Sequence, residues 1–200
     1  MDDLTDEAMN EFNREFPLVY NTFQLYRTDR FDFLKKSFEK ASKNGYILGA
    51  KIVRGAYMEK ERERAEELNY DSPILATKKD VDISFNSGMN FCFEHLERIA
   101  VCIASQSEES NVLAIKQMNE LQIPHNHEHV CFSQLYGMGD NITFNLAASG
   151  YNANKYLPYG PVKEVIPYLI RRAQENSSVQ GQMGRELSLI VKELKRRRKK

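Results

Sequence analysis

The residues of this chain with the clearest chemical potential are two adjacent arginines, Arg171 and Arg172, which follow a turn rich in proline and glycine. Neighbouring guanidinium groups supply planar forks that bind a carboxylate through paired hydrogen bonds. The pair therefore indicates a small carboxylate ligand. Two solvated arginines on a helix are the alternative interpretation, and spacing alone favours it.

A second segment, residues 51–57 (KIVRGAY), places a lysine inside an apolar run that ends in a glycine turn. If Lys51 faces the interior of a barrel, its ammonium could stabilise an anion that develops on a ligand. A lysine that extends to solvent from the strand end is the alternative. In a third segment, residues 132–139, Gly137 and Gly139 allow the backbone to approach a ligand closely.

The elements that must hold these residues alternate between short apolar runs and segments with helical periodicity. Strands are expected at residues 18–23, 46–53, 99–104, 129–132 and 155–157. Helices are expected at residues 30–43, 58–69, 81–93 and 140–149, and after Ser107 and Pro161. Repeated strand-helix units of this length indicate a parallel sheet, either doubly wound or closed into a barrel.

Two further helical features are predicted from the apolar spacing. Leu4, Ala8, Phe12 and Phe16 recur every four residues, which predicts an amphipathic helix over residues 4–16 that Pro17 ends. Near the other end of the chain, Pro167 is expected to kink or restart the helix that begins after Pro161, because proline removes a backbone donor.

Polar and glycine-rich residues follow nearly every expected strand, as they do at the functional face of a (β/α)8 barrel. No G-x-G-x-x-G motif follows a strand, which lowers support for a dinucleotide-binding doubly wound sheet. A closed barrel needs eight units and typically about 250 residues, more than this chain provides. The chain is thus either doubly wound or the C-terminal part of a longer barrel.

Three motifs together are specific for one family. K-x-V-R-G-A-Y at residues 51–57, Q-L-Y-G-M at 134–138, and Y-x-P-Y-G-P at 156–161 followed by P-Y-L-x-R-R-x-x-E-N at 167–176 resemble those of the proline dehydrogenase family, in the same order. The resemblance covers nearly all of residues 1–190. It implies an α/β fold, the C-terminal portion (about strands four to eight) of a distorted (β/α)8 TIM-type barrel. It also implies a partial barrel domain over residues 1–191 and a basic tail at 192–200.

The resemblance assigns roles residue by residue. Contacts to the proline carboxylate and ring are implied for Arg171, Arg172, Tyr156, Tyr57, Leu135 and Ala56. Contacts to the cofactor FAD are implied for Gln24, Lys51, Val53, Arg54, Gly55, Ala56, Thr77, Lys79, Ser105 and Gln106. Lys51 stands where many relatives place an arginine beside the flavin N5 atom, and it is the expected catalytic cation. Gln106 replaces a usual histidine and cannot titrate.

The reaction implied by the resemblance transfers a hydride from the ring carbon beside the proline nitrogen to flavin N5. It yields Δ1-pyrroline-5-carboxylate and passes the electrons to a quinone. The family's substrate-pairing lysine and a flavin-contacting aspartate belong to segments upstream of Met1, so we expect that the chain neither folds stably nor turns over alone. The alternatives are an inactive fragment or interaction module, or another barrel enzyme, such as an aldolase or isomerase, that binds a carboxylate or a phosphate.

The formal net charge is zero, but residues 192–200 (KELKRRRKK) hold seven basic side chains and one acidic one. The other residues carry 21 basic and 27 acidic side chains, a balance of −6, which argues against a nucleic-acid-binding body. The tail could contact RNA or an anionic membrane surface, although a solvated helix end is favoured. The expected partners are L-proline and a quinone, with no nucleic acid, and peripheral membrane contact is left open.

The first residues are acidic, and no run approaches the roughly 20 apolar residues of a membrane-spanning helix, so neither a signal peptide nor a span is expected. Cys92, Cys102 and Cys131 are an odd number without close spacing and lie in apolar runs, which indicates buried, unreactive thiols in a reducing compartment. The expected location is cytoplasmic or peripheral to the inner membrane, which is mitochondrial in a eukaryote.

Alternate histidines at residues 125, 127 and 129 could ligate a metal ion if they lay on one face of a strand. Pro124 and Asn126 indicate a loop instead, and no fourth ligand is evident nearby. The sequence therefore favours a solvent-exposed loop, and no metal is expected.

Overall fold

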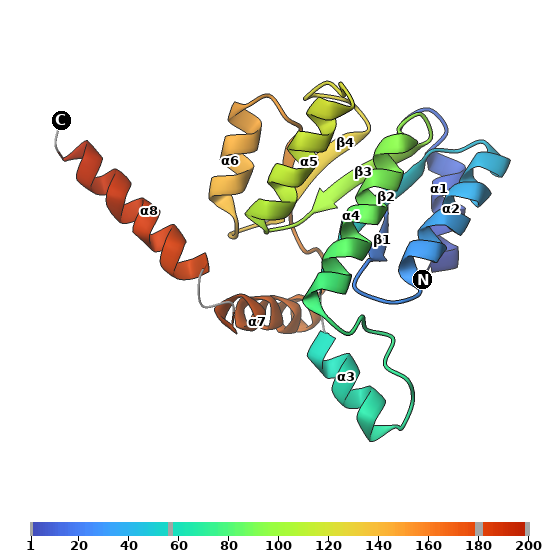
Figure 1. The fold of residues 1–200 in the computed structure, drawn as a ribbon, viewed down its shortest axis with the longest axis horizontal. Helices are drawn as coiled ribbons and strands as arrows, with labels where there is room; N and C mark the ends of the chain where they lie inside the picture. Colours follow the sequence, from blue (N-terminus) through green and yellow to red (C-terminus); the bar gives the residue numbers. More distant parts are fainter. Residues whose placement is uncertain (1, 56–57, 179–181, 199–200) are drawn as a thin grey trace. The chain divides into compact units, whose positions relative to one another are not determined.

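The computed structural model describes residues 2–55, 58–178 and 182–198 (Figure 1). The chain divides into two compact units, Met1–Lys155 and Tyr156–Lys200, and each is described by itself. The first unit holds nearly all of a five-stranded sheet and the helices that cover it. The second holds two helices.

The sheet contains five parallel strands in the order in which they occur along the chain. They are β1 (Asn21–Gln24), β2 (Leu48–Val53), β3 (Ile99–Ala104), β4 (Val130–Leu135) and β5 (Ala153–Tyr156). Sequential order with parallel direction requires a crossover after each strand, and helices supply these crossovers. The α/β fold expected from the alternating pattern is confirmed, and each strand overlaps the range predicted for it.

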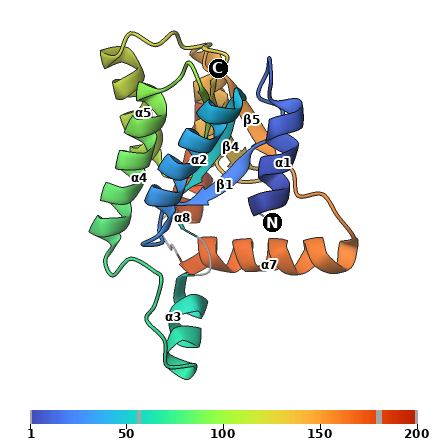
Figure 2. The same ribbon diagram turned by 90° about the vertical axis from the view of Figure 1, so that its right-hand side faces the viewer.

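The helices of the first unit follow the predicted ranges to within a few residues, α1 excepted. They are α1 (Asp2–Phe12), α2 (Arg30–Asn44), α3 (Met58–Glu67), α4 (Lys78–Glu94), α5 (Glu108–Glu120) and α6 (Asp140–Ala148). Figure 2 shows α2, α4 and α5 along one side of the strands. The second unit contains α7 (Val162–Ser178) and α8 (Gln182–Arg197), and α8 was anticipated only as a basic helix end.

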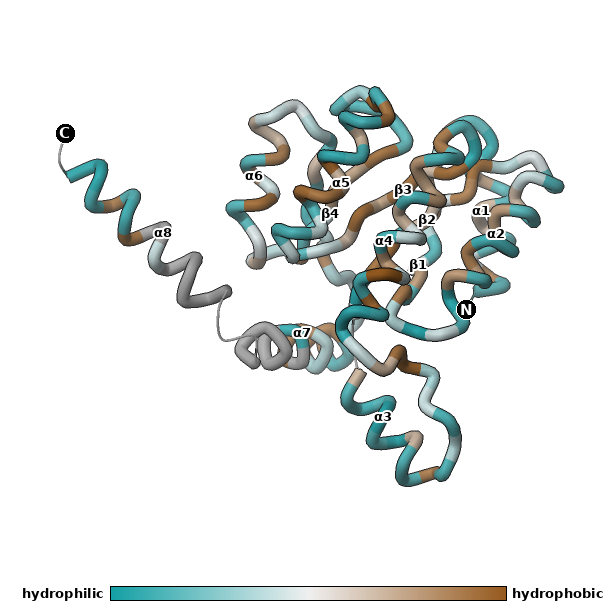
Figure 3. Tube along the Cα trace, in the orientation of Figure 1, coloured by the Kyte–Doolittle hydropathy of each residue, from teal (hydrophilic) through white to brown (hydrophobic). Residues whose placement is uncertain are grey.

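The core lies between the sheet and these helices, because alternate strand residues point toward them. Ile52, Ile103 and Phe132 are fully buried there against a layer that includes Phe85 and Met89 of α4. Figure 3 shows the apolar colour concentrated along β3, whereas the charged helix α3 is mostly hydrophilic. Because the apolar residues of the strands and of α4 are buried in one layer, alternate residues of each strand must face the helices.

The remaining strand residues form the opposite side of the sheet, which we call the inner face. On β1 to β4 it is made by Thr22, Gln24, Gly49, Lys51, Val53, Ala100, Cys102, Ala104, Cys131, Ser133 and Leu135. The backbone before β1 lies against this face, since a Cβ atom on Gly49 would stand 2.0 Å from the carbonyl oxygen of Val19. Only glycine permits that approach, so Gly49 fixes the path of the chain into β1.

The predicted helix over residues 4–16 is wrong at its C-terminal end and in its buried face. Helix α1 ends at Phe12, and Leu4, Phe12 and Phe16 are 65%, 53% and 60% exposed. The buried side instead carries Met9 and Asp6, whose carboxylate pairs with Lys40 at 2.7 Å. Polar groups therefore direct the packing of this helix, and the apolar spacing did not reveal it.

Asn13 ends α1 through its side chain. It is fully buried, its amide donates to the carbonyl oxygens of Val19 (2.7 Å) and Ile47 (3.0 Å), and its Oδ1 accepts from the backbone N–H groups of Leu18 (2.9 Å) and Val19 (2.8 Å). An asparagine that satisfies backbone groups outside the helix competes with helix continuation. The chain consequently turns at Asn13, before Pro17.

Of the two outcomes expected at Pro167, the restart does not occur, because α7 continues through it from Val162 to Ser178, and the kink stays a prediction. Pro167 lies in the second turn, where it removes a single donor, the one that would bond the Lys163 carbonyl. Along the described stretches of the chain, none of the helices combines the length and apolarity needed to cross a bilayer.

Candidate functional site

The predicted site residues of the first unit gather at the carboxyl ends of β1 to β4. Because these strands are parallel and adjacent, the loops that follow them lie at one edge of the sheet. This edge carries Gln24, the Arg54–Gly55 turn, the Ser105–Ser107 loop and the end of β4 at Leu135. The topology thus brings together residues that are more than one hundred positions apart.

Lys51 stands on the inner face in the middle of β2. Its register partners are Thr22 on β1 and Cys102 on β3, and its side chain is half-buried. Burial lowers the pKa of the Lys51 ammonium, and the neighbouring Cys102 thiol partly opposes that shift. The structure therefore supports the interpretation of a lysine that faces inward, because a solvated strand-end lysine would not be desolvated in this way.

Gln24 ends β1 on the same face, in register with Val53. Its Oε1 atom is buried and has no hydrogen-bond partner among the residues that the structure describes. A buried acceptor without a partner is costly, so such an atom marks a place where a ligand can donate a hydrogen bond. Sequence reasoning named Gln24 only through the family resemblance.

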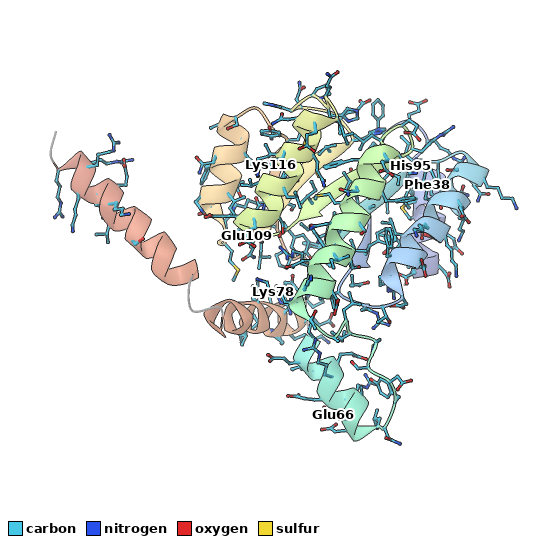
Figure 4. The ribbon with its side chains drawn as sticks, in the orientation of Figure 1. Phe38, Glu66, Lys78, His95, Glu109 and Lys116 are labelled. Carbon is cyan, nitrogen blue, oxygen red and sulfur yellow. The ribbon has the colours of Figure 1, made fainter. Side chains whose placement is uncertain are left out.

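Arg54 directly follows β2, and its side chain contacts residues near the starts of α4 and α5. Its Nη1 donates to the hydroxyl oxygens of Ser107 (3.2 Å) and Ser110, and its Nη2 pairs with the carboxylate of Asp82. Burial lowers the pKa of Arg54, with Glu109 acting in the opposite direction. Glu109 lies near the start of α5 in Figure 4. The guanidinium is thus held beside the N-terminal end of α5, where both charge and backbone N–H groups favour an anion.

The loop after β3 is held rigidly by side-chain hydrogen bonds. Asn111 donates to the carbonyl oxygens of Ser105 (3.1 Å) and Ser107 (2.7 Å), and the Ser107 N–H donates to Ser105 Oγ at 3.1 Å. Ser107 is the N-cap of α5, as predicted, and accepts from the Ser110 N–H. Gln106 is half-buried, and its amide contacts the sulfur of Met138 at 3.5 Å. The loop is therefore preorganised.

The end of β4 is fixed in the same manner. Gln134 is buried, donates to the Ser105 carbonyl at 3.1 Å, and accepts from the Thr143 hydroxyl at 2.7 Å. Lys155 on β5 donates to the Met138 carbonyl at 2.7 Å and pairs with Asp140 at 2.6 Å. These contacts hold the glycine-containing turn that follows Leu135, which is itself buried on the inner face.

Thr77 and Lys79 lie at the start of α4 and are exposed. Thr77 is the N-cap, and together with Asp80 it forms a capping box. Its hydroxyl is thus engaged in capping the start of α4, while Lys79 lies in the first turn of the helix.

The predicted substrate residues are distributed differently. Ala56 and Tyr57 lie outside the described residues, and Arg171 stands in α7 with its side chain outside the description. Arg172 is half-buried, and its guanidinium carbon lies 5.4 Å from the centre of the Tyr168 ring. These two arginines and Tyr156 belong to the second unit. The prediction that Arg171 and Arg172 lie close to Lys51 in space is not tested by this structure.

The histidines lie before β4, at the amino end of the sheet, and their rings contact neighbouring protein groups. His125 Nδ1 lies 3.0 Å from the Ser149 carbonyl, and His129 Nδ1 lies 2.5 Å from that of Leu96. His127 Nδ1 accepts from the His129 N–H, and burial lowers the pKa of His127. Within the described residues, no cluster suited to a metal ion is found.

The fourth histidine, His95, lies at the same end of the molecule. Its ring stacks on Phe38 with 4.5 Å between centroids. Figure 4 shows it at the opposite end of α4 from Lys78, and therefore away from the carboxyl edge of the sheet.

Sequence reasoning missed four polar residues that hold the site loops, namely Asp82, Ser110, Asn111 and Thr143, and it named Gln134 only as part of a motif. Polar residues inside otherwise apolar helix and strand patterns are the one signal that could have found them. It also missed that Cys102 and Cys131 are register partners on β3 and β4. The expectation of buried thiols is confirmed for Cys92 and Cys102, whereas Cys131 is partly exposed.

Comparison with known proteins identifies the family to which this chain is similar. A sequence profile described as Proline dehydrogenase matches residues 1–185. Proline dehydrogenase 1, mitochondrial, from Homo sapiens is 42% identical over 197 residues, an alignment that covers 97% of this chain and 33% of the human protein. The protein of the same name from Drosophila melanogaster is 38% identical over 204 residues, covering 97% of this chain and 30% of its own length. The chain thus spans about a third of these curated relatives.

A solved structure has the same arrangement of elements. The crystal structure of proline utilization A (PutA) from Bdellovibrio bacteriovorus, inactivated by N-propargylglycine, superimposes with a TM-score of 0.78 at 27% sequence identity. The match covers 87% of this chain and 18% of that protein. The five parallel strands therefore correspond to part of its proline dehydrogenase barrel.

Proposed function

The chain belongs to the proline dehydrogenase family, and from this premise we propose that it forms part of an enzyme that oxidises L-proline to Δ1-pyrroline-5-carboxylate. The observation that carries the proposal is the desolvated Lys51 ammonium on the inner face, at the sheet edge that also holds the unsatisfied Gln24 oxygen. A cation and an open acceptor at the carboxyl edge of a parallel sheet suit a polar, partly anionic cofactor.

The family is FAD-dependent, and the residues of the first unit fit that cofactor. When bound, FAD supplies the hydride acceptor for oxidation of the ring carbon beside the proline nitrogen. Gln24 would donate a hydrogen bond to the flavin or accept one from it. Arg54, together with the N-terminus of α5, would bind negatively charged groups of the cofactor. Val53, Gly55, Ser105 and Gln106 would complete the contacts, with Thr77 and Lys79 at the adenine end.

Lys51 is the proposed catalytic cation. Its ammonium is held on a rigid strand between two register partners, so little reorganisation is needed when negative charge develops nearby. A lysine acts as a point charge with rotatable donors, whereas an arginine would present a planar fork. The role thus requires the protonated form.

The arginines of α7 are proposed to bind the substrate carboxylate, because two adjacent guanidinium groups can hold both of its oxygens. Tyr156, Tyr57, Leu135 and Ala56 would pack around the pyrrolidine ring. Burial of Leu135 on the inner face supports an apolar wall there. Holding the ring in one orientation would supply the proximity component of catalysis.

The remaining parts of the proposal concern partners and organisation. A quinone is proposed as the electron acceptor, and peripheral contact with the inner membrane is proposed with it. The relatives named mitochondrial support a mitochondrial location in a eukaryote. The proposed barrel domain spans residues 1–191, and the tail at 192–200 would contact an anionic membrane surface. Turnover is proposed to require the barrel strands that lie outside these 200 residues. The edge position of β1 in the sheet of described residues and the exposed Leu4, Phe12 and Phe16 support this proposal.

A chimaera tests the proposal. The aligned 197 residues of the human relative are replaced by this chain, and flavin absorbance and proline-dependent quinone reduction are measured. We expect the chimaera to retain FAD and oxidise proline. A folded chimaera without flavin would favour an interaction module, and one that turns over an aldol or phosphate substrate would favour the other barrel enzymes.

The requirement for the other strands is tested on the isolated 200-residue chain. We expect no retained FAD and no proline oxidation, because the sheet has an open edge at β1. A sharp thermal melt with bound flavin would contradict this expectation.

A further inference from the structure

Two of the three cysteines are neighbours across the sheet. Cys102 on β3 and Cys131 on β4 are register partners, and both lie on the inner face. Cys92 lies on α4, on the helix-covered side of the sheet, where it is fully buried in the core. All of α5 lies between the two cysteines in the sequence, so strand pairing is what brings the two thiols together.

The backbone geometry suits a covalent link between them. Adjacent parallel strands lie about 4.8 Å apart, and register partners therefore have Cα atoms at roughly that separation. This value falls within the range of Cα separations found in disulfides, about 4.4–6.8 Å. Because the two side chains project from the same side of the sheet, no change of register is needed to join them.

The surroundings of the pair favour reactivity. Lys51 is the register partner of Cys102 on the other side, so an ammonium group adjoins the two thiols. Donation from the Cys102 thiol, and from Asn154, lowers the pKa of Cys131, while the same interaction with Cys131 raises the pKa of Cys102. A partly exposed thiol with a lowered pKa near a cation is the typical environment of a reactive cysteine.

The other groups that face the pair are polar and uncharged at neutral pH. Ser133 contacts Cys102, and Tyr20 lies near both thiols with its pKa raised, chiefly by burial. Tyr20 belongs to the segment that Gly49 admits against the inner face. The thiols thus lie beside Lys51 and against the segment of chain that leads into β1.

We propose that Cys102 and Cys131 form an oxidation-sensitive dithiol, which a hydroperoxide converts into a disulfide between β3 and β4. The Cys131 thiolate attacks one peroxide oxygen, the O–O bond breaks, and the other oxygen leaves as water after taking a proton. The Cys102 sulfur then attacks the sulfenic sulfur of Cys131, the S–O bond breaks, and a second water leaves. The two thiols lose two electrons, and hydrogen peroxide is reduced to two waters.

The link would join strands that are already paired, so the fold is retained while the inner face changes. Oxidation replaces an ionisable neighbour of Lys51 with a neutral disulfide. The inference does not rest on the proposed function, because it concerns this chain's own thiols and holds with or without flavin.

Thiol mapping tests the proposal on the native chimaera chain, because the isolated 200 residues are not expected to fold stably. The reduced chain is treated with hydrogen peroxide, free thiols are alkylated in denaturant, and peptides are identified by mass spectrometry. We expect Cys102 and Cys131 in one linked peptide pair and Cys92 alkylated. Linkage should proceed about tenfold or more faster than in guanidinium, because the folded strands hold the two sulfurs together. Linkage through Cys92, retention of all three thiols, or equal rates in guanidinium would overturn the proposal.

Matched variants identify the attacking sulfur. In Cys102→Ser the sulfenic acid of Cys131 should persist and be trapped by dimedone, whereas Cys92→Ser should behave as the unmodified chain does. Trapping on Cys92 but not on Cys131 would count against the mechanism.

A second measurement needs no oxidant. Phenylarsine oxide bridges two neighbouring thiols, so it should protect Cys102 and Cys131 from alkylation in the native chain. Cys131→Ser should abolish protection of Cys102. Protection that survives this substitution would show that the two thiols do not act as a pair.

Discussion

Replacement of Lys51 by methionine in the chimaera is expected to remove the cation on the inner face while keeping the length of the side chain. Lys51 is half-buried, and burial lowers its pKa, so its charge is poorly screened by solvent. Loss of one preorganised donor of this kind typically costs about 100-fold to 1,000-fold in kcat. We therefore expect a fall of that order in kcat for proline, with Lys51→Arg within about tenfold of the original because the charge is kept.

The pH profile provides the sharper readout. The required protonated form of Lys51 is lost as the pH rises through its pKa, and burial places that pKa below the usual 10.5. The alkaline limb of kcat against pH should thus lie below 10.5 in the chimaera and move upward in Lys51→Arg, since arginine remains charged.

The assay is proline-dependent reduction of a soluble quinone across the pH range, with flavin content measured for each variant. Lys116→Met, on the exposed side of α5, is the matched control and should leave kcat unchanged. If Lys51→Met retained flavin and lost less than about threefold in kcat, or if the alkaline limb did not move in Lys51→Arg, the reasoning about Lys51 would be refuted.

Three further predictions concern the parts of the chain around this site. Arg171→Met in the chimaera should raise the KM for proline about 10-fold to 100-fold, because a charged hydrogen bond to the carboxylate is lost, and an unchanged KM would remove Arg171 from that role. Asn13→Ala should destabilise the chimaera by about 2–4 kcal/mol, because it leaves two carbonyl and two N–H groups without the side chain that binds them. Urea-induced flavin release measures this loss of stability. Asn10→Ala is the control, since it removes one exposed bond to Arg14 and should cost under about 0.5 kcal/mol. Gly49→Ala should cost about 3 kcal/mol or more, since the new Cβ would meet the Val19 carbonyl oxygen at 2.0 Å, and a variant as stable as the original would show that this contact is easily relieved.

The strands were predictable from the sequence where their local signal was strong. IAVCIA predicted Ile99–Ala104 to the residue, because a strand buried on both sides is apolar at every position. The boundaries of β1 and β5 were less accurate, since both strands are short and carry polar residues on the inner face. The spacing of Leu4, Phe12 and Phe16 predicted the wrong buried face for α1, because the packing of this helix depends on the polar residues Asp6 and Asn13.

The residues of the candidate site could likewise be predicted only where a short motif marks them. The K-x-V-R-G-A-Y motif located Lys51 and Arg54, and the family resemblance located Gln24 and Ser105. The polar contacts that hold the loops, such as Asn111 to Ser105 and Thr143 to Gln134, could not be predicted. Each joins segments whose separation in space depends on helix packing rather than on local residue preferences.

The sequence alone determined the alternation of strands and helices, the position of each functional motif at a strand end, and the family to which those motifs belong. These properties arise from residue periodicity and from short motifs, both of which are local. Only the tertiary structure decided that Lys51 lies between Thr22 and Cys102, and that Cys102 meets Cys131. Strand register sets these contacts, and register is fixed by the packing of the whole sheet against its helices.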